Sequence, residues 1–349
     1  MTAYLDRART IVGYHLARAP ESFIRRVTAR RPIAIDGQRL DPQTQHAMVL
    51  LQGASRGPLD ELPLDVARRE YAEFPRVFEG PPQPLPRVED DALPGPDGDI
   101  PIRIYGPTAT RRPLPALVFF HGGGGVIGSI ETHDGLCRLL CCELEALVIS
   151  VDYRLGPEHP FPAAPNDALA AYRWVVTHAR SLGVDPQRVA VGGDSHGGNL
   201  SAVVCQLARD GGEPPPRAQL LIYPALDRVT PTASLRLFGE GFLLTAAMID
   251  WFAREYLAGA DPGDPRVSPR RHPDLRGLPP AVIVTAGFDP LRDEGRAYAD
   301  ALRDAGGTVR YHCWDGLVHG FAQMTGVVEP ARRAIHEAAL ELRALMGRA

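Results

Sequence analysis

The amino-acid sequence predicts an α/β protein whose central sheet is mostly parallel and is covered by helices on both faces. Three observations predict this class. Short apolar runs alternate with longer helical patterns along most of the chain. Several of these runs are apolar at nearly every position, which is typical of parallel strands buried on both faces. Polar motifs directly follow several runs, at the sheet edge where such proteins place their active sites.

The composition is that of a globular protein without an acidic or basic partner. The chain has 349 residues, of which 44% are hydrophobic and 23% charged, and its net charge is −4. This length can bury a large core, and the charge gives no reason to expect nucleic acid as a partner. The sequence contains no lysine. That absence excludes Schiff-base enzymes, Walker-A nucleotide sites and Ser–Lys dyads.

The cysteines and the hydropathy favour a reducing compartment. No apolar run is long enough to span a membrane, and no signal-peptide core is found, so we expect a cytoplasmic location. The cysteines lack the ligand spacing of a metal site, so we expect buried thiols and no metal. They are Cys137, Cys141, Cys142, Cys205 and Cys313.

The N-terminal third is irregular. Residues 1 to about 31 carry seven arginines against two acidic residues, and their apolar residues recur at helical spacing. We expect a helix packed on the body of the protein, and contact with a membrane surface is the alternative. Residues 32–85 are proline-rich, with short helices expected at 42–52 and 64–74 and little strand.

Strands and helices alternate from residue 86 onward. An apolar/polar alternation predicts a half-exposed strand at 100–105. Further strands are expected at 114–120, 146–152, 188–193, 219–224, 281–287 and 308–314. Helices are expected at about 134–145, 163–181, 199–208, 292–305 and from 330 to the end. Residues 225–266 interrupt this alternation with an aromatic-rich helix at about 246–258, which suggests an insertion over the carboxyl edge of the sheet.

The motif Gly193-Asp194-Ser195-His196-Gly197 lies between a predicted strand and a predicted helix. Glycines flank the serine because a Cβ would collide in so sharp a turn. Such a strained elbow lifts a serine hydroxyl above the sheet, where it can act as a nucleophile. A glycine-rich turn without chemistry is the alternative.

Three further groups follow strands. The run His121-Gly122-Gly123-Gly124 frees backbone N–H groups to stabilise an oxyanion; a phosphate loop is the alternative, but no lysine follows it. Asp289 and His319 follow the last two strands. The order serine, acid, histidine along the chain is the one expected for an α/β hydrolase. Asp293 and Glu294 are rival acids that could instead begin the next helix, where negative charge is favourable.

Together these motifs resemble the hormone-sensitive-lipase-like esterases of the α/β-hydrolase superfamily, a bacterial family IV pattern. The resemblance implies an α/β-hydrolase fold with a helical cap, hydrolysis of carboxylic esters through an acyl-enzyme, and no cofactor. It implies Ser195 as nucleophile, His319 as base and Asp289 as the acid that orients His319. The segments that carry it are 121–124, 150–164, 193–199, 289–294 and 319–321.

The resemblance also implies an oxyanion hole made by the backbone N–H groups of Gly122, Gly123 and His196. It implies an N-terminal cap region at 1–85, a core at 86–224 and 267–349, and a cap insertion at 225–266. A closed pocket between cap and core suits short to medium acyl groups. We expect it to be lined by Gly124, Gly125, Asp194, Phe242, Leu243, Leu244 and Leu317.

The sequence departs from the family pattern at two positions. Gly125 stands where the family usually has an aromatic residue, and His196 where it usually has a small one. Neither departure removes a catalytic group, so we expect an effect on substrate range. Because positive charge is disfavoured at a helix N-terminus, we expect a neutral His196 imidazole packed under the elbow.

Two other functions remain open at this stage. An amidase or carbamate hydrolase would use the same three residues. A ligand-binding protein of the same fold would have lost one of them, usually the histidine, and here all three are present. The expected partner is a small-molecule ester, and the sequence leaves open whether the protein is a homodimer.

Overall fold

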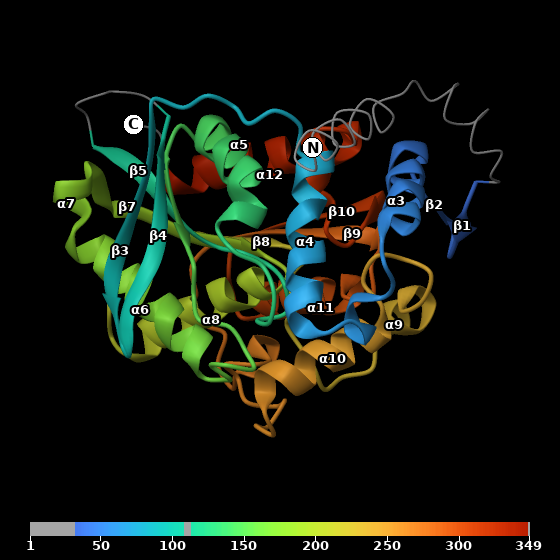
Figure 1. Ribbon diagram of the computed structural model, residues 1–349. Coiled ribbons are helices and arrows are strands. Elements are labelled where there is room, and N and C mark those ends of the chain that lie inside the picture. Colours follow the sequence, from blue (N-terminus) through green and yellow to red (C-terminus); the bar gives the residue numbers. More distant parts are fainter. Residues whose placement is uncertain (1–31, 108–112, 348–349) are drawn as a thin grey trace.

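The computed structural model describes residues 32–107 and 113–347. β4 (Gly98–Gly106) is antiparallel to its neighbours β3 (Arg87–Gly95) and β6 (Leu147–Val151). All other neighbouring strands of the eight-stranded sheet are parallel, which confirms the predicted class. From one edge, the sheet (Figure 1) begins with β10 (Val309–Val318), β9 (Ala281–Phe288), β8 (Gln219–Ile222), β7 (Val184–Asp194) and β5 (Leu114–Phe120), and it continues with β6, β4 and β3.

Helices cover both faces of this sheet. In Figure 1, α5 (Asp134–Leu144) and α12 (Glu329–Met346) lie above the sheet. The helices below it are α6 (Ala163–Thr177), α8 (His196–Asp210) and α11 (Arg292–Asp304), with the short α7 (Ala179–Leu182) after α6. The other helices and turns are α3 (Pro42–Ala54), α4 (Leu64–Phe78), α9 (Ala233–Phe238), α10 (Ala246–Leu257), η1 (Leu59–Glu61), η2 (Glu131–His133), η3 (Pro269–Arg271) and η4 (Phe321–Met324).

The central strands β5, β6, β8 and β9 are buried along almost their whole length because each of their faces meets a separate core. In β5, Val118 and Phe120 pack into the core formed with α6, α8 and α11. Leu117 and Phe119 alternate with them and pack into the core formed with α5 and α12. Successive side chains of a strand point to opposite faces, so only a strand buried on both sides needs an unbroken apolar run.

The structure differs from the sequence-based expectations in a few elements. The edge strand β3 was not expected, because its sequence is acidic and half of its residues are exposed. The small hairpin of β1 (Ala34–Ile35) and β2 (Gln38–Arg39) and the helix α9 were also missed. The helix expected at 163–181 is two helices that divide at His178. The expected basic segment at 1–31 lies outside the described residues.

Candidate active site

Ser195 occupies a strained turn between β7 and α8. Its φ is 53°, a left-handed value that is unusual for a residue with a side chain. A Cβ on Gly193 would come within 2.5 Å of the carbonyl carbon of Gly197, and a Cβ on Gly197 would collide with the carbonyl group of Phe120. The two glycines therefore permit the turn, and the Ser195 side chain lies at the carboxyl edge of the sheet.

Asp289, His319 and Ser195 form a continuous hydrogen-bonded series. His319 Nε2 lies 3.0 Å from Ser195 Oγ, and His319 Nδ1 lies 2.9 Å from Asp289 Oδ2. Asp289 is fully buried, and its other oxygen accepts the backbone N–H of Leu291 at 2.8 Å. The structure thus brings together three residues that are separated by 124 and 30 positions in the chain.

The two rival acids are engaged elsewhere. Asp293 accepts the backbone N–H of Ser234 at 2.7 Å. Glu294 accepts the backbone N–H of Leu226 at 2.6 Å, and burial raises the pKa of its carboxyl to about 8. Each therefore binds the segment that follows β8 instead of His319.

The prediction that Gly122 donates to an oxyanion is wrong, because its N–H already has an acceptor. It donates to Asp194 Oδ1 at 2.8 Å. No acceptor among the described residues takes the N–H groups of Gly123, Gly124 or His196. Gly124 was expected only as a pocket residue, and the sequence offered no way to tell which glycines of the run have free N–H groups.

The motif at 150–164 supports the glycine loop. Tyr153 donates its hydroxyl to the carbonyl of His121 at 2.7 Å, and Gly156 donates its N–H to the carbonyl of Gly125 at 2.8 Å. Arg68, from α4, donates to the carbonyls of Val126 and Gly156, at 3.0 Å in both cases. These bonds hold the loop backbone from two sides.

The two departures from the family pattern lie in contact with each other and with α10. A Cβ on Gly125 would lie 2.6 Å from the Tyr256 ring and 2.9 Å from His196 Nε2. Neither ring nitrogen of His196 has a hydrogen-bond partner among the described residues. Burial, then the positive charge of Arg228, lowers the pKa of His196 well below its usual value. The imidazole is therefore neutral, and these rings fill the space beside Gly125.

Several of the expected pocket residues are core residues instead. Asp194 is 2% exposed and lies beneath the glycine loop, and Leu317 has no exposed surface, so the expectation that they line a pocket is wrong. The Phe242 ring packs on Phe238 and Phe288, with ring centroids 5.7 and 5.3 Å apart. Gly124 is covered by the Phe252 ring of α10. Leu243 and Leu244 are half-buried and buried, respectively.

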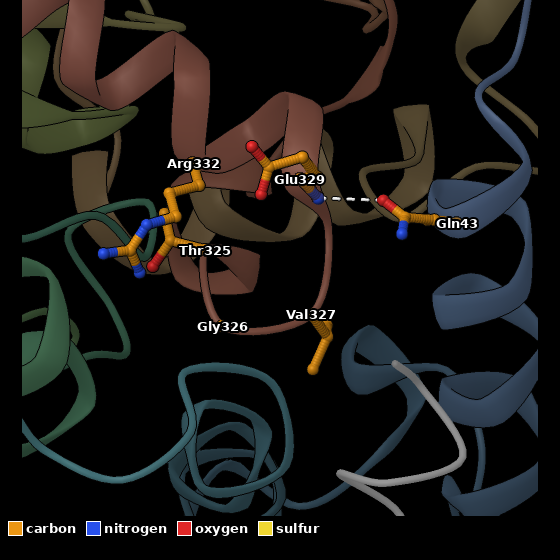
Figure 2. Close-up of a pocket in the computed structure, with 6 residues that line it drawn as sticks. All are labelled: Gln43, Thr325, Gly326, Val327, Glu329 and Arg332. Atoms are coloured by element: carbon orange, nitrogen blue, oxygen red, sulfur yellow. Dashed lines mark hydrogen bonds between the residues drawn. The ribbon is translucent and has the colours of Figure 1, made fainter. Parts of the chain in front are cut away.

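A cavity of about 470 Å³ lies elsewhere, between α3 and the start of α12 (Figure 2). The backbone N–H of Glu329 donates to Gln43 Oε1 across it at 2.9 Å. None of the residues expected to bind substrate lines this cavity. The residues that line it are Gln43, Thr325, Gly326, Val327, Glu329 and Arg332.

No group of side chains in residues 32–107 and 113–347 has the composition and proximity of a metal site. Cys137, Cys141 and Cys205 are buried, as expected. Cys142 is exposed and Cys313 is half-buried, so the expectation of a buried thiol is wrong for these two. No helix in the described part of the chain is long and apolar enough to cross a membrane.

Comparison with known proteins agrees with the observed fold. The profile of the alpha/beta hydrolase fold matches residues 117–323. Carboxylic ester hydrolase LipN of Mycobacterium tuberculosis is 47% identical over 92% of this chain and 87% of its own length. Ethyl acetate hydrolase of Pseudomonas putida is 38% identical over 84% and 95%.

Two solved structures are similar over nearly their whole length. An α/β hydrolase enzyme from the metagenome of Lake Arreo superposes with a TM-score of 0.86 and 44% identity, over 88% of this chain and 99% of its own. The hyperthermophilic esterase of Pyrobaculum calidifontis gives a TM-score of 0.82 and 39% identity, over 87% and 98%.

Proposed function

The chain belongs to the hormone-sensitive-lipase-like family of the α/β-hydrolase fold, and from this premise we propose that it hydrolyses carboxylic esters with Ser195 as the nucleophile. The observation that carries the proposal is the continuous series Ser195–His319–Asp289, with contacts of 3.0 and 2.9 Å. A serine hydroxyl is a weak nucleophile until a base takes its proton, and the imidazole of His319 lies within hydrogen-bond reach to do so.

In the proposed mechanism, Ser195 Oγ attacks the ester carbonyl while His319 Nε2 takes its proton. Asp289 holds the His319 ring in the tautomer that leaves Nε2 free to accept, and it stabilises the imidazolium that forms. The protonated His319 then returns the proton to the leaving alcohol. Water deprotonated by the same nitrogen cleaves the acyl-enzyme.

The oxyanion of each tetrahedral intermediate would be held by the backbone N–H groups of Gly123, Gly124 and His196. Two observations support this assignment. No described residue accepts a hydrogen bond from these three N–H groups. In addition, His196 begins α8, and the N–H groups at a helix N-terminus attract negative charge. Each such donor contributes about 3 kcal/mol to the transition state.

We propose that the segments at 1–85 and 225–266 cap the core and enclose the acyl group. In support, α10 of the insertion packs Phe252 on Gly124 and Tyr256 on Gly125. Bulky rings over the glycine loop would restrict the acyl group to short or medium chains. The relatives are esterases, so an amide or carbamate substrate is not favoured. We also propose a cytoplasmic location, which the five free cysteines support.

The decisive experiment measures hydrolysis of nitrophenyl acetate and nitrophenyl butyrate by the native protein and by Ser195→Ala. We expect the variant to keep its circular dichroism spectrum and to lose at least about a thousandfold in kcat. A folded Ser195→Ala protein with native turnover would refute the assignment of the nucleophile.

A further inference from the structure

A second imidazole–carboxylate pair lies beneath the glycine loop, and the mechanism above does not use it. His133, at the end of η2, places its Nε2 3.0 Å from Asp194 Oδ1. Both side chains are buried. Asp194 immediately precedes the nucleophile in the chain, whereas His133 comes from the segment between β5 and α5 and was not singled out by any motif.

The surroundings of each group favour its charged form. Burial acts to lower the pKa of His133, but the charge and hydrogen bond of Asp194, with Glu79 nearby, outweigh it and raise that pKa. Burial acts to raise the pKa of Asp194, but His133, followed by His121 and His319, outweighs it and lowers that pKa. A buried charge is tolerated only when it is paired and hydrogen-bonded, so each group depends on the other.

The shared carboxylate oxygen also binds the glycine loop. Asp194 Oδ1 accepts the Gly122 N–H at 2.8 Å, and a Cβ on Gly122 would come within 2.5 Å of Asp194 Oδ2. The Tyr223 hydroxyl donates to Oδ2 at 3.3 Å. The loop backbone at Gly122 therefore rests directly on the Asp194 carboxylate, and the next two residues are the proposed oxyanion donors.

His133 is itself fixed from the other side. Its Nδ1 lies 2.8 Å from Thr132 Oγ1. The carbonyl of Thr132 accepts Gln323 Nε2 at 2.9 Å, and the Tyr71 hydroxyl of α4 donates to Gln323 Oε1 at 3.1 Å. Hydrogen bonds thus connect Tyr71 of α4 to Gln323 of η4, Gln323 to Thr132, and Thr132 to the imidazole of His133. The imidazole in turn contacts the Asp194 carboxylate, which binds Gly122.

We propose that His133 is a positioning residue for ester hydrolysis: through Asp194 it holds Gly122, and thereby sets the Gly123 and Gly124 N–H groups at the oxyanion. The proposal rests on the function proposed above. An oxyanion donor acts on the transition state more than on the bound ester, so displacing the loop lowers kcat and leaves KM nearly unchanged.

The test compares His133→Gln with His133→Asn in the full-length protein. The Gln amide can bring an N–H to the place of Nε2 and keep the bond to Asp194, whereas the shorter Asn amide reaches only the place of Nδ1. We expect His133→Asn to lose about 30-fold in kcat for nitrophenyl butyrate. His133→Gln should retain most of the native kcat, and KM should stay within about threefold of the native value in both variants.

His312→Gln is the matched control, because His312 lies 3.0 Å from Glu341 in a pair distant from the loop. We expect this variant to keep native kcat.

A trifluoromethyl ketone, which forms an oxyanion adduct with the serine, provides the second readout. Its affinity should fall in the Asn variant by about the same factor as kcat/KM. Equal kcat in the Gln and Asn variants, a loss confined to KM, or unchanged ketone affinity would overturn the proposal. If neither variant folds, Thr132→Val decides. It removes the contact with His133 Nδ1 together with the two hydrogen bonds of Oγ1 to the Ser129 backbone. A several-fold loss in both kcat and ketone affinity supports the proposal, and native kcat overturns it. Absence of Ser195-dependent turnover in the native protein would instead refute the proposed function.

Discussion

The imidazole of His196 lies edge-on against the phenol ring of Tyr256, with ring centroids 4.6 Å apart. Tyr256 belongs to α10 and His196 directly follows the nucleophile, so this contact joins the insertion to the elbow. A side chain on Gly125 would strike both rings. The two departures from the family pattern are therefore coupled: the bulk missing at Gly125 is supplied by His196 and Tyr256.

The first prediction concerns the two histidines nearest Ser195. His196→Ala should keep an appreciable part of the native kcat, because its imidazole is neutral and its backbone N–H survives the substitution. His319→Ala should lose at least about a thousandfold, because it removes the base. Initial rates from about pH 6 to 9 test both variants. A folded His196→Ala protein as inactive as His319→Ala would mean that the base is assigned wrongly.

The second prediction concerns the space beside Gly125. Gly125→Ala should destabilise the protein by a few kcal/mol, in the range of about 1–3 for overpacking plus backbone strain, because its Cβ meets Tyr256 and His196. Gly306→Ala is the control: it has a similar φ, 83° against 78°, but no atom within 4 Å of its Cβ. Urea unfolding measures both. Equal losses of stability in the two variants would show that the Tyr256 and His196 rings move aside without lowering the free energy of unfolding.

The third prediction concerns Glu294. Its folded-state pKa of about 8 lies above the ordinary 4.5, so folding favours the protonated form. The stability from this group is present below about pH 4.5 and is lost as the pH rises through about 8, at up to about 1.4 kcal/mol per pH unit. Glu294→Gln keeps an acceptor for the Leu226 N–H and cannot ionise. We expect the variant to lose less stability than the native protein between about pH 5 and 9, as measured by urea unfolding. Parallel curves for the two proteins would contradict the raised pKa.

The fourth prediction concerns the acyl chain. The rings of Phe252 and Tyr256 pack against Gly124 and Gly125, beside the proposed oxyanion site. We expect kcat/KM for nitrophenyl esters to peak at roughly two to eight carbons. A maximum at about sixteen carbons would show that the insertion does not close over the site.

Much of this protein follows from local sequence. The strands at 114–120 and 281–287 were predicted nearly to the residue, because a strand buried on both faces is apolar at most positions. The positions of Ser195, Asp289 and His319 also follow from the chain order, since parallel strands bring the residues after their carboxyl ends to one edge. These three residues can therefore be proposed as a catalytic triad without knowing where their side chains point.

The tertiary structure decided what depends on contacts between distant segments. Asp194 determines which N–H groups of the glycine loop are free, because it accepts the N–H of Gly122 although it lies 72 positions away in the chain. The role of His133 is visible only through that same carboxylate. The edge strand β3 is acidic and half exposed, and it became recognisable only by pairing with β4. The hydrophobic periodicity of a segment indicates which of its faces are buried. Hydrogen-bond partners depend instead on which distant segments lie close together in space, and the local sequence does not specify this.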